Sequence, residues 1–197
     1  MSRPIAALGI VGSPREGANT DTLVTEVLRG AEGAGAATRK LFVGKYEISP
    51  CKSCGGCVKT GRCVERDGMD ELVPLLDENQ VWVLGSPVYW WGASAQMKLF
   101  VDRWFAPWAN AETRALFRHR VAVVVTPLGD TDANVARHTT GMFADIFAFL
   151  GIPLAATVVA PNVGGSGLAA GADVLKFPEV LAKAREAGRR AVEMAKT

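Results

Sequence analysis

The stretch IAALGIVGSPREGANT, residues 5–20, decides the class of fold. Residues 5–11 form a continuous apolar run, which is typical of a strand covered on both faces. A Gly-Ser-Pro turn ends this run, and a polar loop leads into residues 21–32, where apolar side chains recur at helical spacing. The stretch therefore predicts a buried strand, a loop and a helix.

The same unit returns along the chain, because apolar runs alternate with helical patterns up to the C-terminus. The expected strands are 5–11, 38–43, 81–84, 121–125 and 154–160, and the expected helices are 21–32, 70–79, 93–105, 134–150 and 178–196. This alternation predicts a single α/β domain over residues 1–197, with a doubly wound five-stranded parallel sheet. Ligands of such sheets bind at the carboxyl ends of the strands.

Composition excludes several classes of function. The 197 residues are 49% apolar and 21% charged, with a formal net charge of +2. This charge is too small to indicate a nucleic-acid or membrane partner. The N-terminus lacks a signal-peptide cleavage site, and Asp145 and the break at 151–153 interrupt the longest apolar stretch. We expect a cytoplasmic protein, whose cysteines are normally reduced.

The loop after the first strand, GSPREGANT at residues 12–20, contains groups that suit an anion-binding site. Backbone N–H groups at a helix N-terminus attract anions. The hydroxyl and amide groups of Ser13, Asn19 and Thr20, with the cation Arg15, suit a terminal phosphate monoester. The alternative is an ordinary helix start, with Asn19 or Thr20 as the N-cap.

The loop after the third strand begins the sequence GSPVYWWGASAQMKLFVDR, residues 85–103. Tyr89, Trp90 and Trp91 follow one another there, and aromatic side chains in a surface loop need a reason. They favour stacking on a flat ring or contact with a second subunit. The alternative is a loop that packs on its own domain.

Together these two loops resemble those of the NADPH-dependent FMN reductases of the flavodoxin-like superfamily, and the resemblance extends over about residues 5–160. It implies the flavodoxin sheet, order 2-1-3-4-5, and the cofactor FMN. It also implies a first loop around the phosphate and a second along the flavin ring. The residues carried over are Ser13, Arg15, Asn19 and Thr20 for the phosphate, and Ser86, Pro87, Val88, Tyr89, Trp90 and Gly92 for the flavin. The loop after the fourth strand, TPLGD, departs from the pattern, because Pro127 removes a backbone donor.

All four cysteines lie in an insertion after the second strand, the cysteine loop (residues 44–68), at Cys51, Cys54, Cys57 and Cys63. A structural disulfide is disfavoured in a reducing compartment, and a four-cysteine zinc site remains open. Successive two-residue spacings are typical of iron–sulfur ligands, and Gly55 and Gly56 would relieve the tight turns. The run resembles that of the iron-sulfur flavoproteins, a branch of the same family, which implies a [4Fe-4S] cluster on these four residues.

These features predict an FMN-dependent oxidoreductase that relays electrons between flavin and cluster, as an electron carrier or a dehydrogenase of a small metabolite. The alternatives are an NAD(P)H-dependent FMN or quinone reductase with inert cysteines, and a zinc-stabilised binding module. The expected partners are a small-molecule substrate or a redox protein, with NAD(P)H left open. The aromatic residues predict a homodimer or homotetramer. The sequence names no catalytic side chain.

Overall fold

The fold is known from a computed structural model, which describes residues 4–164 and 172–197. At its centre lies a five-stranded parallel sheet with the order β2-β1-β3-β6-β7. Its strands are β1 (Ala6–Val11), β2 (Ala37–Phe42), β3 (Val81–Gly85), β6 (Val121–Pro127) and β7 (Leu154–Ala160). In chain order this is 2-1-3-4-5, so the predicted flavodoxin-like sheet is confirmed.

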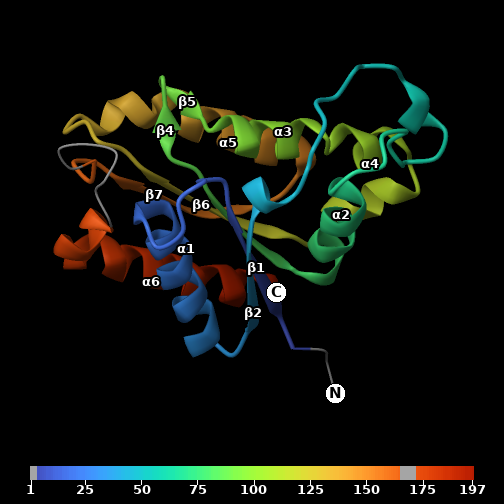
Figure 1. The fold of residues 1–197 in the computed structure, drawn as a ribbon. Helices are drawn as coiled ribbons and strands as arrows, with labels where there is room; N and C mark the ends of the chain where they lie inside the picture. Colours follow the sequence, from blue (N-terminus) through green and yellow to red (C-terminus); the bar gives the residue numbers. More distant parts are fainter. Residues whose placement is uncertain (1–3, 165–171) are drawn as a thin grey trace.

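Six α-helices within the described residues cover both faces of this sheet. They are α1 (Asn19–Gly33), α2 (Met69–Glu78), α3 (Ala95–Asp102), α4 (Phe105–Ala109), α5 (Arg137–Leu150) and α6 (Pro178–Ala195). Figure 1 shows α1 and α6 below the sheet, and α2, α3 and α5 above it. None of the helices in residues 4–164 and 172–197 is both long and apolar enough to span a membrane.

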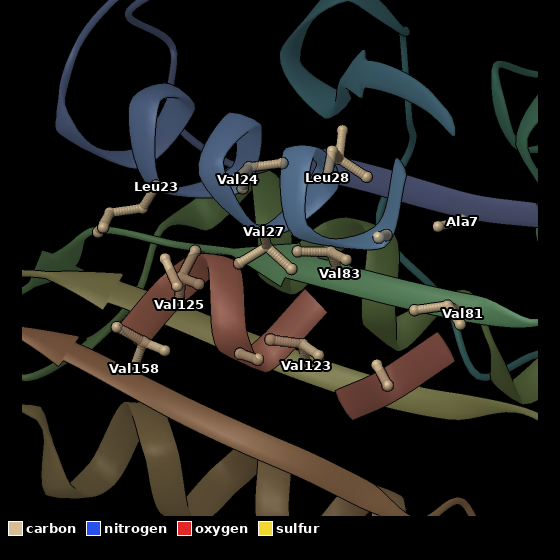
Figure 2. Close-up of a cluster of buried hydrophobic side chains, with 14 of the residues drawn as sticks. Ala7, Leu23, Val24, Val27, Leu28, Val81, Val83, Val123, Val125 and Val158 are labelled. Carbon is tan, nitrogen blue, oxygen red and sulfur yellow. The ribbon is translucent and has the colours of Figure 1, made fainter. Parts of the chain in front are cut away.

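The lower core is built from small aliphatic side chains, because α1 and α6 pack closely together. Figure 2 shows the α1 residues facing valines of three strands: Leu23, Val24, Val27 and Leu28 against Val81, Val83, Val123, Val125 and Val158. A Cβ on Gly188 of α6 would lie 1.9 Å from the Val27 carbonyl oxygen. This close approach of two helices is therefore possible only with glycine at that position.

The upper core lies between the sheet and the helices α2, α3 and α5, and it is rich in aromatic side chains. Trp82 of β3 is fully buried, and its ring lies 5.5 Å from the Trp104 ring and 6.1 Å from the Phe117 ring. Its indole N–H donates to the carbonyl oxygens of Leu76 (3.1 Å) and Asn79 (2.9 Å). This core fixes α3 and α4 relative to the sheet.

The region between β3 and β6 differs from the sequence prediction. The predicted loop contains a short antiparallel hairpin of β4 (Val88–Tyr89) and β5 (Gly92–Ala93). The predicted helix over 93–105 is two helices, because α3 ends at Asp102 and α4 begins at Phe105. A continuous helix would need the missing N–H of Pro107 to reach the Arg103 carbonyl group, which explains the break.

Candidate functional site

The loops after β1 and β3 meet at the carboxyl edge of the sheet, as the sequence predicts. The Gly12 N–H donates to the Gly85 carbonyl oxygen at 2.7 Å. The Ser94 hydroxyl donates to the Gly12 carbonyl oxygen at 2.6 Å, and the same oxygen of Ser94 caps α3 by accepting from the Met97 N–H. Both loops are thus held by bonds that also build the sheet and α3.

The first loop (residues 12–20) gathers buried hydroxyl groups beside the start of α1. Ser13 is only 3% exposed, and its Oγ accepts the Arg15 N–H at 3.2 Å. Thr20 is also buried, in the first turn of α1. The N-cap is Ala18, and no side chain in the described part of the chain caps this helix. The reading of Asn19 or Thr20 as the N-cap is therefore wrong, and the first turn keeps backbone N–H groups for an anion.

The Asn19 side chain binds backbone groups that are far away in the sequence. Its amide group donates to the Val163 carbonyl oxygen, and its Oδ1 accepts the Val174 N–H at 2.9 Å. The side chain therefore ties the segments on either side of residues 165–171 to the start of α1. An anion at the first loop would meet the backbone N–H of Asn19, and the side-chain amide keeps a second N–H, because its nitrogen carries two hydrogens.

The second loop presents aromatic rings on a strained hairpin turn. Trp90 and Trp91 both have positive φ angles, 49° and 62°, in the left-handed region that bulky residues avoid. Trp90 is 91% exposed, while Tyr89 and Trp91 are about half exposed. Such strain persists where the surroundings impose it, and it gathers at ligand and partner sites.

Beneath this turn the remaining predicted flavin contacts are firmly placed. Ser86 is fully buried, and its hydroxyl accepts the Ser94 N–H and donates to the Pro87 carbonyl oxygen, each at 3.0 Å. Val88 and Gly92 lie half-buried on the two strands of the hairpin. These residues form one rim of the edge where the two loops meet.

The third loop at this edge leaves one polar group without a partner. Thr126 is fully buried near the end of β6, and its hydroxyl has no hydrogen-bond partner among the described residues. Buried polar groups are normally paired, so such an exception asks for a ligand or water. Pro127 does not disturb the loop, because the next residue, Leu128, donates its N–H to Ala160 at 2.9 Å.

The cysteine loop lies at the other end of the molecule from the hairpin, beside α4 (Figure 1). All four cysteines line one cavity of about 470 Å³, with Phe105, Ala106 and Arg103 among the other lining residues. Cys57 is buried on the 3₁₀ turn Gly56–Val58, and burial raises the pKa of its thiol. Cys51 and Cys54 are exposed, and Cys63 is half-buried.

The positions of the four thiols limit which metal group they can bind. No three metal-binding side chains in residues 4–164 and 172–197 converge closely enough to hold a single ion. A tetrahedral zinc ion needs four sulfur atoms at about 2.3 Å from one point. A group bound by these thiolates would occupy the cavity that the four cysteines line.

Two groups of contacts hold the cysteine loop in place. At its base, Asp67 accepts the backbone N–H groups of Ser49 (2.9 Å) and Met69 (3.0 Å) and forms an ion pair with Arg103. At its rim, the Asn110 amide donates to the carbonyl oxygens of Val58 and Lys59.

The roles of Arg103, Asp67 and Asn110 at the cysteine loop were not predicted from the sequence. The one signal for them is an arginine directly after α3, on the helix face that turns toward the core.

Three comparisons place the chain among known proteins. It is 41% identical over 97 residues to an iron-sulfur flavoprotein of Archaeoglobus fulgidus, covering 49% of this chain and 44% of the relative. It is 40% identical over 96 residues to an iron-sulfur flavoprotein of Methanocaldococcus jannaschii, covering 49% and 50%. The chain thus aligns with about half the length of these curated relatives.

Among solved structures, an NAD(P)H:quinone oxidoreductase from Methanothermobacter marburgensis has the same fold. The TM-score is 0.71 at 15% identity, over 95% of this chain and 96% of the other. The sequence model of NADPH-dependent FMN reductase matches residues 5–163, which is most of the 197-residue chain. The chain therefore belongs to the NADPH-dependent FMN reductase family.

Proposed function

We propose that the protein is an FMN-dependent oxidoreductase that also holds a [4Fe-4S] cluster. It would relay electrons between the two groups, as an electron carrier or as a dehydrogenase of a small metabolite. The observation that carries the proposal is the cavity lined by all four cysteines, in a family whose curated relatives are named iron-sulfur flavoproteins.

The residues at the carboxyl edge of the sheet fit FMN. The uncapped first turn of α1 offers backbone N–H groups, and Ser13, Arg15 and Thr20 add hydroxyl groups and a positive charge for the phosphate. The hairpin residues Tyr89 and Trp90, with the Ser86–Val88 segment beneath them, would border the flavin ring. The unpartnered Thr126 hydroxyl adds a buried polar group at the same edge.

The cysteine loop fits an iron–sulfur cluster, because four thiols line its cavity and an apolar wall is formed by Phe105 and Ala106. Cys51, Cys54, Cys57 and Cys63 would be the ligands. FMN exchanges electrons singly or as a hydride, whereas a cluster exchanges them singly. The protein's part is to bind and orient both groups.

NAD(P)H is the electron donor that the family name suggests. An oligomer is favoured by exposed aromatic side chains, since Phe105 and Phe149 border a groove of about 520 Å³ between α3, α4 and α5. Trp108 also lines this groove, with its ring 5.3 Å from that of Phe149. A second subunit covering this groove would bury the rings of Phe105, Trp108 and Phe149.

A visible spectrum of anaerobically purified protein, before and after addition of NADPH, tests the proposal. We expect flavin bands together with a broad absorption shoulder. Electron paramagnetic resonance of the reduced protein should show the signal of the reduced cluster. Flavin bands alone, after reconstitution with iron and sulfide, would leave a reductase with inert cysteines. A colourless protein would leave a binding module.

A further inference from the structure

Arg103 is a buried cation at the wall of the cysteine cavity. Its side chain is only 1% exposed, although arginine is almost never fully buried without a partner. Arg103 is the residue that follows α3, and the packing of α3 in the upper core holds its backbone in place. It borders the cavity lined by the four cysteines, and it also borders a second cavity, of about 380 Å³, on the far side of Cys63.

One side of the guanidinium group closes the base of the cysteine loop. Nη1 donates to the Ser49 carbonyl oxygen (2.6 Å) and to Asp67, and Nη2 donates to the other Asp67 oxygen (3.3 Å). Asp67 in turn accepts backbone N–H groups from both ends of the loop. Arg103 and Asp67 therefore form one buried unit that joins α3 to both ends of the cysteine loop.

The guanidinium group also interacts with the side chain of Cys63. Nε of Arg103 is buried and has no hydrogen-bond partner among the residues that the structure describes. Burial lowers the pKa of Arg103, but Asp67 and the neighbouring Cys63 outweigh it, and the pKa lies above its usual value. The positive charge of Arg103 is therefore held next to Cys63, at the wall of the cysteine cavity.

We propose that Arg103 is a positioning residue that holds a buried positive charge at the Cys63 side of the cluster, and thereby raises its reduction potential. Asp67 opposes this effect with its negative charge. The inference rests on the proposed function, because it assumes that the four cysteines hold the cluster.

The sign of each effect follows from electrostatics. Reduction adds one negative charge to a cluster whose thiolate ligands are already anionic, so a nearby cation favours the reduced form and a nearby anion disfavours it. These interactions are strong because both side chains are shielded from water. Arg66 is a natural control, since its side chain is 66% exposed and pairs with Asp70 at the surface, where water screens its charge.

A purely structural role for the Arg103–Asp67 pair predicts something different. Loss of either partner would then loosen the loop and lower the iron content in the same way. The clusters that remained would titrate at the wild-type potential. A pair of shifts with opposite signs is therefore a signature that loosening alone does not produce.

The test is a potentiometric titration, followed by electron paramagnetic resonance, of reconstituted full-length wild type, Arg103→Gln, Asp67→Asn and Arg66→Gln at pH 8. We expect Arg103→Gln to lower the cluster potential and Asp67→Asn to raise it. Each shift should change the reduced-to-oxidised ratio at fixed potential at least tenfold, or about 59 mV for one electron. Arg66→Gln should match the wild type.

Shifts of the same sign, or none, in variants that hold iron would overturn the inference while leaving the proposed function intact. If Arg103→Gln holds no iron, Asp67→Asn decides alone, and an unchanged or lower potential overturns the inference. If Arg103→Gln, Asp67→Asn and Arg103→Lys all fail to hold iron, only the structural role remains and the electrostatic claim is wrong. A wild type without iron would overturn the proposed function first.

Discussion

The two candidate cofactor regions are built in different ways. The carboxyl edge of the sheet, where we propose FMN, is joined by backbone bonds such as that from the Gly12 N–H to the Gly85 carbonyl oxygen. The cysteine loop is held at its base by the Arg103–Asp67 pair and at its rim by Asn110. The first region is therefore part of the fold, whereas the second depends on a few side chains. Damage to one should leave the other intact.

The largest effect is expected from Cys57→Ala, which removes the buried ligand of the proposed cluster. We expect complete loss of iron and acid-labile sulfide, because thiolates are the ligands such clusters need. FMN content should stay at the wild-type value, since the loop's 3₁₀ turn contacts α4, away from the hairpin. Iron, sulfide and flavin assays measure this.

The control for Cys57→Ala is Val58→Ala, a change at the next residue, whose side chain is half exposed. It should keep both groups. Loss of FMN together with iron in Cys57→Ala would show that the two regions are coupled and contradict the comparison.

The corresponding change in the proposed flavin region removes hydroxyl groups from the first loop. Ser13→Ala and Thr20→Ala should each weaken FMN binding about tenfold to a hundredfold, because a hydrogen bond to a charged group contributes roughly 1.5–3 kcal/mol. The iron content should not change. Fluorescence titration of deflavinated protein with FMN gives the dissociation constants, and equal affinities in wild type and both variants would rule out this loop as the phosphate site.

A smaller effect is expected at the hairpin turn. Trp90→Ala should weaken FMN binding about threefold to tenfold, because an aromatic contact adds roughly 0.5–1.5 kcal/mol. The thermal unfolding temperature should hardly change, since the Trp90 ring is 91% exposed and supports no core. Unaltered FMN affinity in Trp90→Ala, with a change in sedimentation instead, would assign the ring to a subunit interface.

The smallest effect is expected at the rim of the cysteine loop. Asn110→Ala removes the amide that donates to the Lys59 carbonyl oxygen at 3.0 Å. A bond of this kind contributes about 0.5–1.5 kcal/mol, so iron should be lost to a chelator a few times faster. Asn134→Ala, on the exposed turn before α5, is the control. Identical rates in all three proteins would mean that the base alone holds the loop.

The sheet and its edge could be predicted from the sequence because their signals are local. Continuous apolar runs mark buried parallel strands, and their order was implied by the family resemblance that the two loop motifs carry. The contacts of Asn19 could not be predicted, because its partners, Val163 and Val174, lie 144 and 155 residues away. A polar side chain in a helix's first turn looks the same in sequence whether it binds an anion or a distant backbone.

The cysteine loop divides in the same way. Its ligand spacing is a local pattern, and the structure brings the four cysteines to one cavity. The ion pair that closes its base joins Asp67 to Arg103, which is 36 residues away. Arg103 lies in the turn between α3 and α4, where the sequence predicts one continuous helix. The break at Pro107 could be suspected from the sequence, but the burial of Arg103 depends on the packing of the aromatic core.

The presence of both redox groups is tested by the number of iron, sulfide and FMN molecules bound per chain after anaerobic reconstitution of the unmodified protein. We expect about four iron, four sulfide and one FMN, as a [4Fe-4S] cluster on four cysteines requires. Full FMN with neither iron nor acid-labile sulfide would contradict this expectation, because the cysteine cavity would then be no part of the redox site.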